Sequence, residues 1–169
     1  KKWVTTSTNK SDTVKSALQF YNDEFYYTLK PPSLGKNPVA EFLFESKRGF
    51  CGHFATSFAT LMRAAGIPSR LVAGYQGGVY NKVGGFYNVR QADAHVWVEV
   101  WLADKGWVRV DPTAAIAPNR IEHSIDPSLQ RINSNINFLL TPPEGLQKWA
   151  QQLKWAINSL DYYWQNSVL

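Results

Sequence analysis

Apolar residues in the first third of the chain recur every three or four positions, the spacing that one face of an α-helix produces. This spacing predicts an amphipathic helix over residues 12–25, with Ser11 or Asp12 as its N-cap. It also predicts a short helix over residues 37–46 and a longer helix that begins next to Cys51. The first third of the chain is therefore expected to be helical.

The middle of the chain changes to a period of two, which is typical of strands with one buried face. A glycine-rich segment, residues 76–85, interrupts this pattern and is expected to be a loop. The four predicted strands are residues 70–75, 86–90, 95–102 and 107–110. The last two flank a turn at residues 103–106 and are expected to form an antiparallel hairpin.

The remainder of the chain is expected to return to helix. Residues 112–143 are polar and weakly patterned, which favours a long surface excursion with one or two short helices, and a helical stripe marks about 144–165. Together these elements predict an α+β fold in a single domain over residues 1–169, with its core in 37–122. At 169 residues and 44% hydrophobic composition, the chain is large enough to bury that core.

Charge and hydropathy change this picture little. The formal net charge is +5, but the longest basic runs are the pairs Lys1-Lys2 and Lys47-Arg48, so we expect no nucleic-acid partner. No stretch reaches the roughly 18 uninterrupted apolar residues of a membrane span, and the N-terminus does not have a signal-peptide layout. We expect the chain as given to be soluble, as a whole protein or as a piece of a larger one.

Three residues are candidates for covalent catalysis. Cys51, the single cysteine, lies at a helix N-terminus, where the positive potential lowers a thiol pKa. His95 opens a strand, and Asp111 ends the next strand before a proline. Each has an ordinary structural alternative, namely a small buried side chain, a satisfied histidine and a turn-forming Asp-Pro. Together they form the nucleophile, base and orienting carboxylate of acyl transfer.

The hairpin turn decides whether His95 and Asp111 share a face of the sheet. Direct pairing of Leu102 with Trp107 would place them on opposite faces, because side chains alternate along a strand. A glycine bulge at Gly106 adds the odd residue that aligns them. The same alignment places Glu99 opposite Arg109.

Five segments resemble the bacterial transglutaminase-like superfamily, and within it the membrane-anchored TgpA type. The resemblance is strong over residues 47–122 and looser at residues 25–32 and in the C-terminal helix. The segments are RGFCGHFA (48–55), MRAAGIPSR (62–70), GYQGG (74–78), DAHVWVEVW (93–101) and GWVRVDPTA (106–114). One position departs from the family pattern, which commonly has glutamate directly after the cysteine, where this chain has Gly52.

This resemblance implies a papain-like, transglutaminase-core fold, in which a helix bearing Cys51 packs on an antiparallel sheet bearing His95 and Asp111. It implies acyl transfer on protein or peptide carboxamides by a Cys-His-Asp triad, with an amine or water as acceptor. It also implies an extracytoplasmic domain, periplasmic in a Gram-negative organism, held by membrane spans absent from this chain. Two alternatives stay open: a cysteine peptidase or amidase acting on peptide or cell-wall amides, and a non-catalytic peptide-binding or assembly module.

Other candidates are weaker. Tyr27 is a candidate second oxyanion donor beside the backbone N–H of Cys51, with packing next to Phe25 as its alternative role. His53, two residues from Cys51 on a starting helix, is expected to point elsewhere. We expect no cofactor and no metal site, because the possible zinc ligands lack paired spacing. Those ligands are Cys51, His53, His95 and His123.

Overall fold

The computed structural model describes residues 9–118, 149, 152–153 and 155–160. The chain forms two compact units, one of residues 1–76 and 94–123 and the other of residues 77–93 and 124–169. Cys51, His95 and Asp111 all lie in the first unit. The expected single domain over 1–169 stays a prediction, because a compact unit is not by itself an independently folding domain.

The first unit begins with helix α2 (Lys10–Glu24), which starts two residues earlier than the predicted 12–25. Its N-cap is Asn9, whose side-chain oxygen accepts a hydrogen bond of 2.8 Å from the backbone N–H of Asp12. The prediction of Ser11 or Asp12 as the cap was therefore wrong. An asparagine oxygen satisfies an orphan N–H of the first turn equally well, and its position two residues upstream lengthens the helix.

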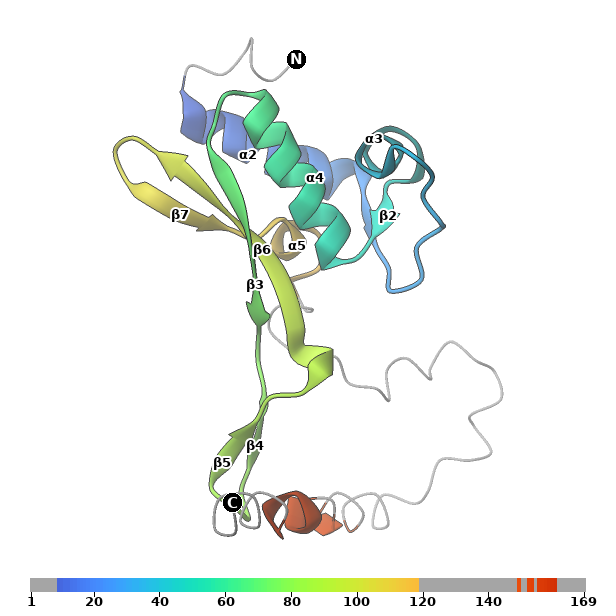
Figure 1. Cartoon of the computed structure of the whole chain (residues 1–169), viewed down its shortest axis with the longest axis vertical. Helices are drawn as coiled ribbons and strands as arrows, with labels where there is room; N and C mark the ends of the chain where they lie inside the picture. Colours follow the sequence, from blue (N-terminus) through green and yellow to red (C-terminus); the bar gives the residue numbers. More distant parts are fainter. Residues whose placement is uncertain (1–8, 119–148, 150–151, 154, 161–169) are drawn as a thin grey trace. The chain divides into compact units, whose positions relative to one another are not determined.

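A three-stranded antiparallel sheet in the order β3-β6-β7 carries the predicted strands of the first unit. These strands are β3 (Ser69–Tyr75), β6 (Ala94–Leu102) and β7 (Gly106–Val110). Helix α4 (Cys51–Ala64) packs on β6 and β3 (Figure 1), against a face of β6 where Val98 and Val100 are fully buried. The predicted α+β class, with the cysteine-bearing helix on an antiparallel sheet, is confirmed.

The β6–β7 turn has the predicted glycine bulge. Gly106 adopts φ 72°, in the left-handed region that glycine tolerates best, and pairs with Leu102. Trp101 consequently lies opposite Trp107, and Glu99 opposite Arg109. The extra residue in the turn therefore puts His95 and Asp111 on the same face of the sheet, as the sequence analysis required.

Aromatic rings fill the space between α2 and α4. The cluster consists of Tyr21, Phe25, Phe42, Phe54 and Phe58, all buried, with neighbouring ring centroids 4.7–6.2 Å apart. The hydroxyl of Tyr21 forms a 2.7 Å hydrogen bond with that of Ser57 on α4, which satisfies both buried groups. This packing joins α2 to α4 within the same core that the sheet valines enter.

The segment between α2 and α4 contains two short strands and a helical turn. Strand β1 (Tyr26–Tyr27) pairs in parallel with β2 (Arg48–Gly49). Helix α3 (Pro38–Glu41) continues directly into a π-helical turn, η1 (Phe42–Ser46). The predicted helix over residues 37–46 is therefore present, with its second half wound more widely than an α-helix.

The polar segment after residue 111 starts in the core rather than on the surface. Helix α5 (Pro112–Ile116) packs against α2 and α4, and Thr113 is 0% exposed. The surface assignment was thus wrong for this helix, because the two helices that cover it come from distant parts of the sequence. The rest of the predicted excursion, residues 119–143, lies outside the described residues.

The second unit contains a hairpin of β4 (Val79–Asn81) and β5 (Phe86–Asn88), followed by a 3₁₀ turn, η2 (Gln91–Asp93). The predicted loop over 76–85 was wrong in part, because residues 79–81 pair with 86–88, and the predicted strand 86–90 ends at Asn88. Buried Asn81 donates a 3.0 Å hydrogen bond to the hydroxyl of Ser159. Residues 149, 152–153 and 155–160 are helical; the other residues of the predicted helix at 144–165 lie outside the described part.

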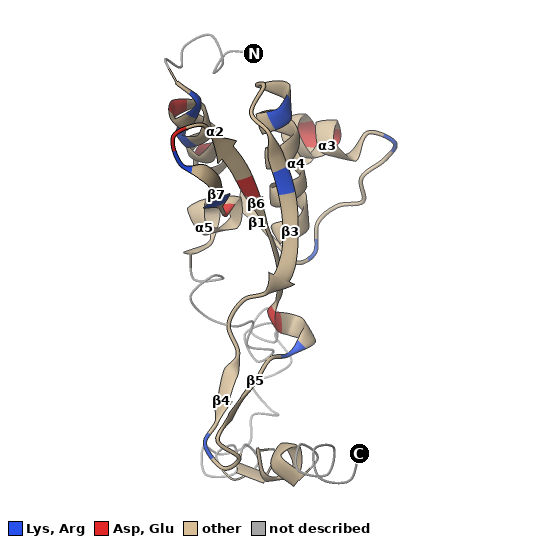
Figure 2. Cartoon of the chain, turned by 60° about the vertical axis from the view of Figure 1, so that its left-hand side comes forward, with Lys and Arg blue, Asp and Glu red and all other residues tan. Residues whose placement is uncertain are grey.

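Charged residues are dispersed in space as they are in the sequence. Figure 2 shows basic and acidic positions scattered over several helices and strands of the described chain, with both kinds on α2. Arg70 on β3 and Glu99 on β6 form an ion pair of 2.6 Å. Within the described residues, no helix is both long enough and apolar enough to cross a bilayer.

Candidate active site

Cys51 is the first residue of α4, as the sequence predicted. The residue before it, Phe50, has extended backbone (φ −116°, ψ −178°) and no side-chain acceptor to cap the helix. The N–H groups of the first helical turn have no acceptor within the helix. The thiol therefore lies beside backbone donors and the positive end of the helix dipole.

His53, the third residue of α4, caps the start of this helix with its side chain. Its Nδ1 accepts a hydrogen bond of 3.3 Å from the backbone N–H of Phe50, and its ring packs edge-on against the ring of Phe50 at 4.4 Å. Burial lowers the pKa of His53, which favours the neutral form that can accept this bond. His53 thus points back toward Phe50, in agreement with the prediction that it points elsewhere than the thiol.

Gly49 sets the close approach of β2 to α4. A Cβ atom at this position would lie 2.7 Å from Cβ and Cγ of His53 and 2.9 Å from Cε2 of Phe42. The chain can enter α4 at this angle only because residue 49 has no side chain.

Gly49→Ala is therefore expected to lower the free energy of unfolding by about 1–3 kcal/mol, the usual cost of overpacking. Gly52→Ala is the matched control, because a Cβ there would lie 3.3 Å from a ring atom of Phe50 and meet no backbone. Urea unfolding followed by tryptophan fluorescence measures both variants. Equal losses in the two variants would contradict the role given to Gly49.

His95 and Asp111 are joined by a short hydrogen bond. Nε2 of His95 donates to Oδ2 of Asp111 over 2.7 Å, and the His95 side chain is only 3% exposed. Oδ1 of Asp111 accepts a 3.1 Å bond from the N–H of Thr113, which caps α5. One carboxylate thus orients the histidine and begins a helix.

The thiol of Cys51 contacts the other side of the imidazole. Burial raises the pKa of Cys51, but a hydrogen bond from His95, its positive charge, and the backbone N–H groups of Val96 and Gly52 outweigh burial and lower the pKa overall. Burial also lowers the pKa of His95, and the bonds to Asp111 and Cys51 raise it to about 9. These shifts favour a thiolate beside an imidazolium. Because Nε2 of His95 is hydrogen-bonded to Asp111, Nδ1 is the ring nitrogen available to the sulfur of Cys51.

Two further side chains cover the histidine and aspartate on the outer face of the sheet. The ring of Trp97 stacks near that of His95 with a centroid distance of 6.3 Å, and the guanidinium of Arg109 lies 4.2 Å over Trp97. Arg109 also lies 3.7 Å from Oδ2 of Asp111 and donates a 3.0 Å bond to Gln76. The alternation along β6 placed Trp97 on this face, but the sequence predicted no contact between Arg109 and Asp111.

Comparison with known proteins places this arrangement in a family. The family model described as "Transglutaminase-like superfamily" matches residues 1–112, well over half of the chain. The chain belongs to the transglutaminase-like superfamily. The resemblance seen in the sequence motifs is thereby confirmed.

Members of the superfamily with high similarity come from two bacteria. The chain is 45% identical over 163 residues to a protein-glutamine gamma-glutamyltransferase of Pseudomonas aeruginosa, covering 92% of this chain and 24% of that protein. It is 40% identical over 113 residues to the uncharacterized protein YebA of Bacillus subtilis, covering 62% of this chain and 15% of YebA. The chain thus spans about a quarter or less of the length of these relatives.

Solved structures of the periplasmic domain of TgpA from P. aeruginosa share the fold of this superfamily member. The ethylmercury-bound form is 48% identical, with a TM-score of 0.70 over 72% of this chain and 44% of that chain. A second structure of the same domain has the same identity and TM-score, over 73% of this chain and 43% of that chain. The predicted similarity to the TgpA type is confirmed at the level of sequence and fold.

Two other predicted features of the transglutaminase-like site are Tyr27 and Gly52. Tyr27, on β1, is half-buried, and its ring stacks on that of Phe54 with a centroid distance of 6.3 Å. Its role as an oxyanion donor stays a prediction. Gly52, where the family pattern commonly has glutamate, leaves space that only a ring edge of Phe50 approaches.

No group of three histidine, cysteine or acidic side chains lies close enough to hold a metal ion within the part of the chain that the structure describes. The fourth residue of the zinc set weighed from the sequence, His123, lies outside that part.

Proposed function

We propose that this chain catalyses acyl transfer from the carboxamide of a glutamine side chain in a protein or peptide, through a thioester on Cys51. The proposal places His95 as the proton carrier and Asp111 as the group that orients it. The main support is that the thiol at the start of α4 interacts with the imidazole of His95, which in turn is hydrogen-bonded to the carboxylate of Asp111. In this arrangement the pKa of His95 is raised and the pKa of Cys51 is lowered. The name of the P. aeruginosa relative supports the glutamine substrate.

In the first half-reaction, the Cys51 thiolate attacks the carboxamide carbon. A C–S bond forms, and the carbonyl π electrons move to oxygen, where the N–H of Cys51 stabilises the negative charge, with Tyr27 as candidate second donor. The imidazolium of His95 then protonates the nitrogen, the C–N bond breaks and ammonia leaves. Asp111 stabilises the imidazolium before this transfer and holds the ring afterwards.

In the second half-reaction, neutral His95 accepts a proton from an amine as the amine attacks the thioester. A new C–N bond forms, the C–S bond breaks, and the thiolate–imidazolium pair is restored. Water in place of the amine gives hydrolysis by the same route. The same site therefore supports cross-linking of proteins and hydrolysis of amides, and the acceptor decides between them.

The proposal includes a periplasmic location in a Gram-negative organism, because the similar TgpA domain is described as periplasmic. It also includes attachment to the membrane through segments beyond this chain, as the sequence resemblance implies. Fractionation of cells that express the full-length protein, with protease treatment of spheroplasts, tests both statements. Protection of the domain from protease in intact spheroplasts would overturn the location.

Incorporation of a fluorescent primary amine into a glutamine-containing protein such as casein tests the activity. We expect covalent labelling by the wild-type chain at pH 7–8 and none by Cys51→Ser, because an alcohol lacks the low pKa of this thiol. Release of only deamidated product would favour the amidase alternative. Cleavage of peptide bonds without labelling would favour the peptidase alternative.

The non-catalytic alternative is tested by the same pair of proteins. If wild type and Cys51→Ser both fail to label, deamidate or cleave any glutamine peptide, and bind such peptides equally well, the chain is a binding module. We expect the reverse, since a module of that kind requires no activated thiol.

A further inference from the structure

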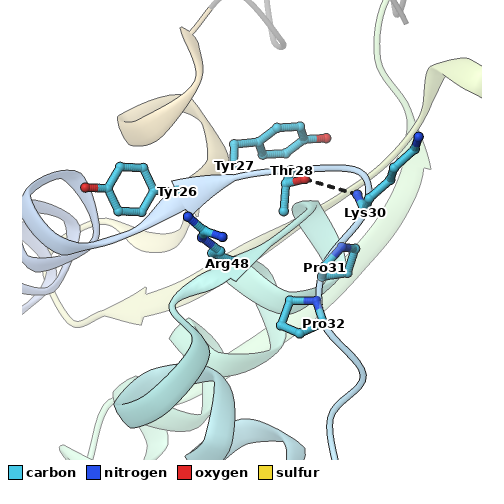
Figure 3. Close-up of a pocket in the computed structure, with 7 residues that line it drawn as sticks. All are labelled: Tyr26, Tyr27, Thr28, Lys30, Pro31, Pro32 and Arg48. Carbon is cyan, nitrogen blue, oxygen red and sulfur yellow. Dashed lines mark hydrogen bonds between the residues drawn. The ribbon is translucent and has the colours of Figure 1, made fainter. Parts of the chain in front are cut away.

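A cavity of about 550 Å³ lies beside the strand that leads into Cys51. Figure 3 shows that its walls come from β1 and the turn after it, together with β2. The lining residues are Tyr26, Tyr27, Thr28, Lys30, Pro31, Pro32 and Arg48. None of them is Cys51, His95 or Asp111, but the lining shares Tyr27, the candidate oxyanion donor, with the site described above.

The backbone ties this cavity closely to the nucleophile. The N–H of Thr28 donates a 2.8 Å bond to the carbonyl of Gly49, and that of Tyr26 donates a 2.9 Å bond to the carbonyl of Lys47, so the wall is hydrogen-bonded to the residues on both sides of Arg48. Cys51 follows Arg48 by three residues. Three residues of chain span at most about 11 Å, which limits the distance between these two Cα atoms.

Two of the seven residues that line the cavity are cations. Lys30 and Arg48 are exposed, and among the described residues no carboxylate lies within 4 Å of either cation. The guanidinium of Arg48 lies 6.0 Å from the ring centroid of Tyr26. The lining thus includes two cations, one from Arg48 and one from Lys30, and positive groups of this kind suit a carboxylate.

The walls are also held in position before any ligand arrives. Pro31 and Pro32 restrict the backbone of one wall, since the pyrrolidine ring fixes φ. The hydroxyl of Thr28 accepts a 3.1 Å hydrogen bond from the N–H of Lys30, drawn as a dashed line in Figure 3. A preformed site loses less conformational entropy on binding than a flexible one.

We propose that this cavity binds an acidic side chain of the acyl-donor peptide, located within about three residues of the reacting glutamine. An extended peptide advances about 3.3 Å per residue, so three residues cover the separation between the Arg48 region and Cys51. This inference rests on the proposed function, and it names the substrate class of the same site. The donor is a peptide segment with aspartate or glutamate beside its glutamine.

Peptide binding to Cys51→Ala protein tests the cavity without requiring turnover. Two fluorescein-labelled glutamine peptides are compared by anisotropy, one with aspartate and one with asparagine at positions two and three on either side of the glutamine. The aspartate peptide is expected to bind at least fivefold more tightly at low salt, and the difference is expected to shrink in 0.5 M NaCl. Equal affinities at low salt would overturn the proposal.

Substitutions within the cavity assign the preference to its two cations. Lys30→Gln and Arg48→Gln, each in the Cys51→Ala background, are expected to weaken binding of the aspartate peptide by about two- to fivefold and to leave the asparagine peptide unchanged. Lys105→Gln is the matched control, because Lys105 is an exposed cation in the β6–β7 turn, away from the lining residues. An equal loss in the control would overturn the assignment.

Charge reversal separates recognition from damage to the fold. The double variant Lys30→Glu with Arg48→Glu is expected to prefer a peptide with lysine at the same positions, which a merely unfolded protein does not do. Amine incorporation by the wild-type chain then tests the proposed function independently. Preferential binding of the aspartate peptide without any amine incorporation would contradict the proposed function and support the proposed role of the cavity. Amine incorporation without this preference would support the function and contradict the role of the cavity.

Discussion

Asp111→Asn is expected to lower the rate of amine incorporation at pH 7 by about three to four orders of magnitude while it keeps the cap of α5. The asparagine oxygen still accepts the N–H of Thr113 and so preserves the cap of α5, which Oδ1 of Asp111 forms at 3.1 Å. The negative charge 2.7 Å from Nε2 of His95 is lost, and with it the principal contact that raises the His95 pKa. Steady-state kinetics with a fluorescent amine and thermal unfolding measure the two effects.

Asp111→Ala is the matched comparison for this prediction. It removes the charge and also the cap, so we expect the same loss of rate and a free energy of unfolding about 1 kcal/mol lower than that of Asp111→Asn. The pair separates the orienting role of the carboxylate from its structural role. An Asp111→Asn rate within tenfold of wild type would exclude Asp111 as the orienting group.

His95→Gln is expected to return the pKa of the Cys51 thiol to its ordinary value or above. The hydrogen bond and positive charge of His95 oppose burial in the native site, and without them burial raises the thiol pKa. About 3% of an ordinary thiol is ionised at pH 7. Alkylation by iodoacetamide at pH 7 is therefore expected to slow by on the order of tenfold.

The full pH dependence of wild-type alkylation tests whether Cys51 and His95 form a thiolate–imidazolium pair. The rate is expected to rise at a pH below the ordinary thiol range, because the Cys51 pKa is lowered, and to change again near pH 9, where His95 loses its proton. Since Cys51 is the single cysteine, the reaction reports this site alone. A wild-type curve with one step at the ordinary thiol pKa, unchanged in His95→Gln, would contradict the ion pair.

The same linkage predicts how stability depends on pH. A histidine whose pKa is raised by folding contributes stability that is fully present below its unfolded value of about 6.5 and is lost as the pH rises through about 9. The difference in unfolding free energy between wild type and His95→Gln is therefore expected to shrink between these two values. Urea unfolding at pH 6, 7.5 and 9.5 measures this change.

The sequence by itself determined the main helices and strands of the first unit and the parity of its hairpin. These elements have long periodic patterns. Side chains alternate along the strands, so His95 and Asp111 share a face only if the turn holds one extra residue, and Gly106 adopts the left-handed conformation that such a turn needs. It also determined the superfamily, because Cys51, His95 and Asp111 each lie in a long local motif. The catalytic roles of these residues stay predictions that the variants above test.

Only the tertiary structure decided which neighbours each side chain has. Glu99 lies opposite Arg109 in the register, yet its ion pair is with Arg70 on the other neighbouring strand, because strand order is not encoded in local periodicity. The polar start of α5 is buried by two helices that are remote in sequence. The cavity lined by β1 and β2 likewise exists only because these two strands pair, a contact between segments some twenty residues apart that no local pattern specifies.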